Sequence, residues 1–138
     1  MNMAGLMLIA WHWRHQLTLG HYLFALLFGA VAVNTGYLLF YPLNTEYFGF
    51  SALLYTLLTY SCIIAIRHEK WINLFILSAV SFAVLRPLWA DGAGQSSQEL
   101  IGVRVATESH LYGWIGGFIS GGTWWARQLQ ANVEPIPT

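Results

Sequence analysis

Two residues that could do chemistry, a serine and a histidine, each lie near the start of a long apolar segment. Ser51 lies in the stretch YFGFSALLYT, and His110 lies in SHLYGWIGGFISGG. A serine hydroxyl is a weak nucleophile until a base takes its proton, and histidine suits that task near neutral pH. Such a pair is the minimum for acyl transfer. A serine in an apolar helix often serves packing instead, so its type alone leaves both roles open.

The residues that follow each member of this pair recur at helical spacing. Glycines stand at every fourth position after the histidine, at Gly113, Gly117 and Gly121. This spacing predicts one helix face on which another backbone can approach closely, and it is also typical of ordinary helix packing. Tyr55 follows the serine by one helical turn, so its ring is expected within reach of the imidazole.

The composition indicates which elements must position these side chains. Of 138 residues, 57% are hydrophobic and only 9% are charged, whereas soluble domains have roughly a quarter charged residues. The chain is therefore expected to be an integral membrane protein with a single domain. The formal net charge of zero argues against a nucleic-acid surface, and the single cysteine, Cys62, excludes an internal disulfide.

The apolar segments predict an all-α, polytopic transmembrane helix bundle. About 20 residues of helix are needed to cross a bilayer. Four segments meet this length approximately, at residues 17–40, 48–66, 71–89 and 110–126. Residues 1–13 are too short to cross and are interpreted as a partial helix. We therefore expect a membrane domain over residues 1–127, with four full spans, and a polar cytoplasmic tail over residues 128–138.

Basic residues predict the orientation of this bundle. The positive-inside tendency assigns four of them, Arg14, Arg67, Lys70 and Arg127, to the cytoplasmic side and leaves Arg86 and Arg104 outside. The helices that begin near residues 48 and 110 then run in the same direction, from the outside to the inside. Ser51 and His110 are consequently expected at a similar depth, a short way below the outer surface.

The serine and histidine motifs together resemble those of the rhomboid intramembrane serine proteases. The resemblance implies that Ser51 is the nucleophile within a Gly-x-Ser element that includes Gly49, that His110 is the general base, and that Tyr55 stacks on it. The short stretch ELIGVRVATESHLYG is closest to the rhombosortase branch, which implies processing of C-terminal glycine-rich sorting tails. The position after the nucleophile is usually glycine in this family and is Ala52 here.

The first residues resemble a rhomboid helix that helps to form the oxyanion hole through a His-x-x-x-Asn pair. Asn2 matches the asparagine, and the matching histidine is expected two positions before Met1. The first helix and part of the second are therefore expected to be missing from this chain. The resemblance implies an endopeptidase without a cofactor, which cleaves membrane-anchored proteins near the outer face of a bacterial inner membrane, with its site toward the periplasm.

Two other functions are considered. A catalytically inactive rhomboid-like protein that binds transmembrane clients would share the fold, and Ala52 together with the missing helix motivates this hypothesis. A small membrane anchor of a redox complex would use histidines such as His12, His15 and His21 for haem. These histidines are better interpreted as marking a membrane boundary beside Arg14, with tryptophans as interfacial anchors.

Overall fold

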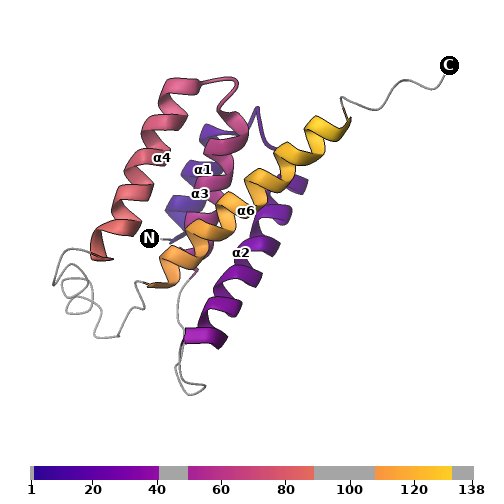
Figure 1. Ribbon diagram of the computed structural model, residues 1–138. Helices are drawn as coiled ribbons and strands as arrows, with labels where there is room; N and C mark the ends of the chain where they lie inside the picture. The colour runs from indigo at the N-terminus through magenta and orange to yellow at the C-terminus, as the bar shows by residue number, and fades with distance from the viewer. Residues whose placement is uncertain (1, 41–49, 89–107, 132–138) are drawn as a thin grey trace.

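A computed structural model of the chain describes residues 2–40, 50–88 and 108–131. The described residues form five α-helices and one short 3-10 helix, and they include no strand. In chain order these are α1 (Asn2–His12), α2 (Leu19–Phe40), α3 (Ser51–Ala65), α4 (Lys70–Leu85), η1 (Arg86–Leu88) and α6 (Glu108–Ala131), shown in Figure 1. The predicted all-α class is confirmed.

Helix lengths agree only in part with the predicted spans. Among the described residues one helix, α2, is long and apolar enough to cross a membrane, whereas α3 and α4 are apolar but have 15 and 16 residues. The count of four spans therefore remains a prediction. Helix α6 continues to Ala131, so the first residues of the expected polar tail, 128–131, are helical. Glutamine, leucine and alanine are good helix formers, and this last turn is exposed.

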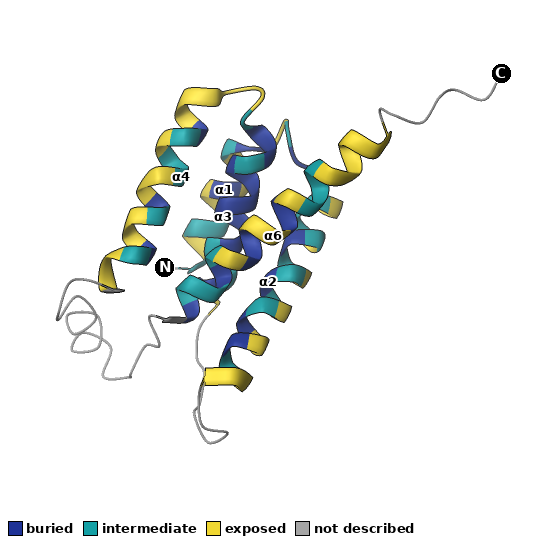
Figure 2. Ribbon diagram, viewed as in Figure 1, coloured by how far each residue is buried: buried dark blue, intermediate teal, exposed yellow. Residues whose placement is uncertain are grey.

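Helix α3 is the centre of the bundle. It is surrounded by the other helices, as the burial colours in Figure 2 show, and polar as well as apolar side chains are buried along it. Its buried members are Ala52, Thr56, Leu57, Thr59, Tyr60, Ser61, Cys62, Ile64 and Ala65. By contrast, α2 exposes Leu23, Leu27 and Val31 along one side. Such an apolar outer face is typical of a helix that contacts lipid.

Helices α1, α3 and α6 all begin at one end of the bundle, where α2 and α4 end (Figure 1). Contacts between helix ends fix this arrangement. Phe40, the last residue of α2, stacks on Tyr112 near the start of α6, with ring centroids 6.1 Å apart. Trp114 Nε1 donates a hydrogen bond of 3.1 Å to Ser81 Oγ in the second half of α4. Helices α3 and α6 thus run in the same direction, as predicted from the charges.

A buried asparagine joins three helices at the opposite end. The Trp13 indole N–H, just after α1, donates to Asn73 Oδ1 over 3.0 Å. The Asn73 amide in turn donates to the carbonyl oxygens of Ala65 and Glu69, at 3.2 and 2.8 Å. These carbonyls lie at the end of α3 and just before α4, and both also accept backbone N–H groups: Ala65 from His68 and Glu69, and Glu69 from Asn73. The Asn73 side chain therefore adds hydrogen bonds across the turn between α3 and α4 and attaches the end of α1 to it.

Candidate active site

The structure brings the predicted serine and histidine into contact. Ser51 is the first residue of α3 and His110 is the third residue of α6. Ser51 Oγ lies 2.9 Å from His110 Nε2, and both side chains are half-buried. This is hydrogen-bond distance, and it is the separation at which a histidine can take a proton from a hydroxyl.

Glycines on α6 allow this contact because they let the two helix backbones touch. A β-carbon added at Gly113, one turn below His110, would overlap the carbonyl oxygen of Ala52. A β-carbon at Gly117 would lie 2.6 Å from Thr59 Cβ, closer than real side chains pack. The row of glycines at Gly113, Gly117 and Gly121 therefore faces α3, and Ile63 is the neighbour at Gly121. Any larger residue at the first two positions would push the helices apart beside the Ser51–His110 pair.

Thr56 is a residue of this interface that the sequence did not single out. Its side chain is fully buried, and its hydroxyl donates to the Gly113 carbonyl oxygen over 2.8 Å. The same hydroxyl lies 3.3 Å from the carbonyl oxygen of Ala52 in its own helix. Threonine commonly bonds its own helix in this way, so its type alone gave no sign of a bond between helices. Thr56 therefore fastens α6 to α3 one turn below the pair.

A second face of α6 packs against α2, which the sequence also did not indicate. A β-carbon at Gly116 would lie 3.1 Å from the Gly29 α-carbon. Further along α2, a β-carbon at Gly36 would lie 2.5 Å from the ring of Tyr112. The adjacent glycines Gly116 and Gly117 could have indicated this second packed face, because neighbouring positions on a helix point toward different partners. Helix α6 is thus held closely between α2 and α3.

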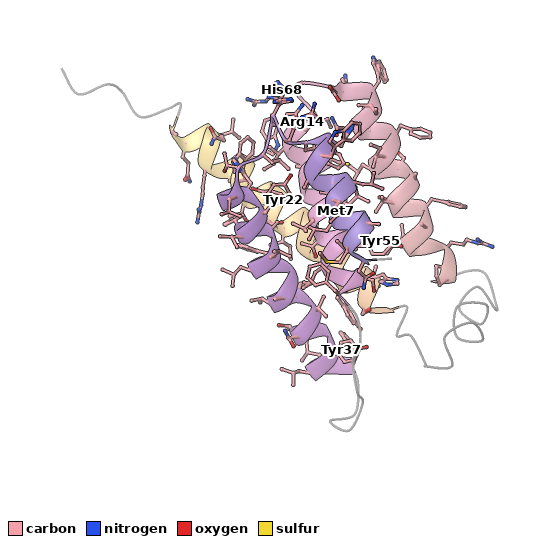
Figure 3. The ribbon with its side chains drawn as sticks, turned by 180° about the vertical axis from the view of Figure 1, so that it is seen from behind. Met7, Arg14, Tyr22, Tyr37, Tyr55 and His68 are labelled. Carbon is pink, nitrogen blue, oxygen red and sulfur yellow. The ribbon has the colours of Figure 1, made fainter. Side chains whose placement is uncertain are left out.

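Tyr55 connects the pair to a cavity. Its ring lies against the His110 imidazole, with centroids 4.6 Å apart and planes inclined by 34°. In Figure 3 Tyr55 lies toward the end of the bundle that carries the pair, away from Arg14 and His68 at the other end. The cavity, of about 500 Å³, lies between α1, α3 and α4. Its lining residues are Gly5, Leu8, Ile9, Leu54, Tyr55, Leu58, Ala79, Val80 and Ala83.

The beginning of α3 presents backbone donors beside the serine hydroxyl. Phe50 occupies the N-cap and makes no side-chain hydrogen bond to the helix. Its carbonyl accepts from the N–H groups of Leu53 and Leu54, at 3.1 and 3.2 Å. The two preceding N–H groups, of Ser51 and Ala52, have no acceptor within the helix because a helix offers none to its first residues. A helix N-terminus of this kind favours negative charge near the hydroxyl.

The two remaining predicted residues have different outcomes. Asn2 is the first residue of α1 and is half-buried. A β-carbon at Gly5 would lie 3.2 Å from Leu54 Cδ1, and since α1 and α3 run in the same direction, Asn2 lies level with Ser51. No hydrogen bond joins them. Gly49 lies outside the described residues.

Histidines that could suggest a metal or haem have other neighbours. His12 Nε2 lies 3.9 Å from a Glu69 carboxylate oxygen, and His21 lies beside Thr18. Within residues 2–40, 50–88 and 108–131, no three histidine, cysteine, aspartate or glutamate side chains are grouped so that they could hold a metal ion.

The described helices form a bundle with apolar outer faces and a serine–histidine contact between two helices. These features are typical of membrane proteins that have a polar site among their helices. The rhomboid domain matches residues 1–127, nearly the whole chain, and the chain belongs to the rhomboid family. Members of this family are integral membrane proteins and are in general intramembrane serine proteases that cleave transmembrane proteins. No curated protein and no solved structure is significantly similar to the chain.

Proposed function

We propose that this protein is an intramembrane serine endopeptidase in which Ser51 is the nucleophile and His110 is the general base. The observation that carries the proposal is the 2.9 Å contact between Ser51 Oγ and His110 Nε2. In a chain of the rhomboid family, a half-buried serine–histidine contact at the beginning of two close-packed helices is the arrangement that acyl transfer needs.

The reaction follows from the positions of these groups. As Ser51 Oγ bonds to the scissile carbonyl carbon, His110 Nε2 takes the hydroxyl proton. The carbonyl oxygen becomes negatively charged, and the N–H of Ser51 together with the Asn2 amide would stabilise it. His110 then gives the proton to the leaving amine as the peptide bond breaks. A water molecule, with the same histidine as base, hydrolyses the ester on Ser51 and restores the enzyme.

The cavity beside Tyr55 supports a membrane segment as the substrate. It is lined by apolar and small side chains from α1, α3 and α4, and Tyr55 lies both in its wall and on the imidazole. An extended apolar segment that entered between α1 and α4 would therefore meet the pair directly. Substrates are proposed to be membrane-anchored proteins, and on the rhombosortase assignment they end in glycine-rich sorting tails.

The proposed orientation rests on charge. Arg14, Arg67, Lys70 and Arg127 lie toward the end opposite Ser51, and basic residues are enriched on the cytoplasmic side of membrane proteins. With α2, α3, α4 and α6 as four spans, the site faces the periplasm of a bacterial inner membrane. Cleavage then occurs near the outer face.

A fluorophosphonate probe, which forms a covalent bond with activated serines, tests the nucleophile. The full chain in detergent is expected to label, and Ser51→Ala is expected to abolish labelling because it removes the attacked oxygen. Ser78→Ala is the matched control, since Ser78 is exposed on α4. Equal labelling of the parent and Ser51→Ala would contradict the assignment. A chain that does not label but still co-purifies with a transmembrane client would instead be an inactive client-binding rhomboid.

The assignment to the rhombosortase branch can be tested by comparing the cleavage of two fusion proteins. One carries a C-terminal glycine-rich tail after its membrane segment, and the other carries the same segment without the tail. Preferential cleavage of the tailed client is expected for a rhombosortase, and equal cleavage of both would contradict that branch.

A further inference from the structure

A second cavity lies at the other end of the bundle, where α2 begins and α6 approaches its end (Figure 1). Its volume is about 310 Å³. The lining residues come from α2, α3 and α6 and the residue before α2: Thr18, Gly20, His21, Phe24, Tyr60, Trp124 and Arg127. None of them belongs to the proposed protease site, and they combine a cation, hydrogen-bond donors and aromatic walls.

His21 is held so that its outer ring nitrogen is a donor. The backbone N–H of Thr18 donates to His21 Nδ1 over 3.1 Å, and Thr18 Oγ1 lies 2.8 Å from the same nitrogen. A ring nitrogen that accepts from a backbone N–H carries no proton, so the ring proton is on Nε2. The arrangement resembles a capping box, in which the third helical residue reaches back to the residue before the helix. It leaves the Nε2–H of His21, a residue that lines this cavity, as a donor.

Tyr60 contributes a hydroxyl that the rest of the structure does not use. The residue is 1% exposed and lines the cavity. Its hydroxyl oxygen is buried and has no hydrogen-bond partner among the described residues. Buried hydroxyls are nearly always hydrogen-bonded, because the loss of water costs free energy that a partner must offset. The Tyr60 hydroxyl is therefore available to donate a hydrogen bond to a ligand in this cavity.

Arg127 supplies a positive charge at the mouth of this cavity. Its guanidinium lies 5.4 Å from the ring centroid of Phe24, and no carboxylate in the described part of the chain pairs with it. The N-terminus of α2, with Gly20 in the cavity wall, adds the positive end of a helix dipole. The cavity thus favours an anion.

We propose that this cavity binds the phosphate group of an anionic phospholipid. Arg127, the His21 Nε2–H and the Tyr60 hydroxyl would donate to the phosphate oxygens, while the first part of an acyl chain would lie against Phe24 and Trp124. A lipid is the favoured source of the phosphate because the cavity joins an anion site to aromatic walls at the basic end of a membrane protein. Basic pockets between transmembrane helices on the cytoplasmic side, to which the proposed orientation assigns this end, commonly bind anionic lipid head groups. The proposal does not depend on Ser51 or on proteolysis.

Native mass spectrometry of the full chain, released from an uncharged detergent with dioleoylphosphatidylglycerol or dioleoylphosphatidylcholine added, tests the site. We expect one tightly bound phosphatidylglycerol and a preference over phosphatidylcholine. Arg127→Gln is expected to weaken this binding about tenfold, because it removes a charged donor. Tyr60→Phe keeps the ring and is expected to weaken it about threefold to fivefold.

Arg14→Gln is the matched control, because Arg14 lies at the same end but its guanidinium bonds the Trp11 carbonyl oxygen and does not line the cavity. It is expected to leave the affinity unchanged. Equal weakening by the Arg14 and Arg127 variants would overturn the proposal, since it would show only general attraction to a basic surface. Competition by inorganic phosphate as strong as that by the lipid would overturn the assignment to a phospholipid.

Discussion

Replacing Gly113 by alanine is expected to separate α6 from α3 at the Ser51–His110 pair. The new β-carbon would overlap the Ala52 carbonyl oxygen, and both atoms belong to backbone or are fixed to it, so no side-chain rotation can relieve the overlap. An ordinary contact between carbon and oxygen requires the helices to move apart by on the order of 1 Å. The present Oγ to Nε2 distance is 2.9 Å, so such a movement takes the pair out of hydrogen-bond range.

Two consequences follow from this movement. Loss of alignment by about 1 Å typically costs about 10²-fold in rate, so fluorophosphonate labelling of Ser51 is expected to slow by about that factor. Overpacking of a close interface costs about 1–3 kcal/mol of folding free energy. Unfolding can be followed with a thiol-reactive dye, because the chain has one cysteine and Cys62 is fully buried in the fold.

Gly122→Ala is the matched control. It makes the same chemical change on the same helix, but a β-carbon at Gly122 meets nothing within 4 Å. Because alanine favours helix over glycine by about 1 kcal/mol, this variant is expected to unfold no more easily than the parent and to label at the parent rate. If Gly113→Ala labels as fast as Gly122→Ala, the close approach of α6 is not what positions His110, and the reasoning fails.

Three further substitutions test other contacts. Thr56→Val keeps the shape and removes the hydrogen bond to α6, so a loss of about 1 kcal/mol in stability is expected in the thiol-dye assay. Tyr55→Ala is expected to slow probe labelling about threefold to tenfold because the imidazole loses its stacked neighbour, and Tyr55→Phe should restore the rate. Asn73→Ala leaves the Trp13 indole N–H buried without an acceptor, so a loss of about 2–4 kcal/mol in folding free energy is expected. Asn34→Ala is the control, because Asn34 is exposed, and a loss of less than about 0.5 kcal/mol is expected for it.

The similar depth of Ser51 and His110 could be anticipated because it depends on features that a sequence records, whereas their contact could not be established before the structure. Basic residues indicate helix direction, helix direction sets the depth of each first turn, and the spacing of Gly113 and Gly117 indicates the face of close approach. Their proposed catalytic roles came from the family resemblance, and they remain to be tested by labelling.

The packing of α2 could not be anticipated. This helix is apolar on every side, so its periodicity gives no preferred face. Only the fold determines that Gly29 points toward Thr56 of α3 and that Gly36 points toward Tyr112 of α6. Likewise, the bond from Thr56 to α6 depends on the rotation of α3 about its axis, which its spacing of polar residues does not specify. The cavities at the two ends arise from gaps among three helices and have no signature in any one segment.

The close packing of α6 has a consequence for how the substrate preference of this protein can change through mutation. Backbone atoms of α3 would overlap a β-carbon at Gly113 or Gly117, so these positions admit no side chain without moving the site. The cavity beside Tyr55 is different, because Leu8 in α1 and Ala83 in α4 line it and are themselves exposed. We therefore expect variation that alters selectivity to accumulate in α1 and α4, while the inward faces of α6 stay nearly invariant.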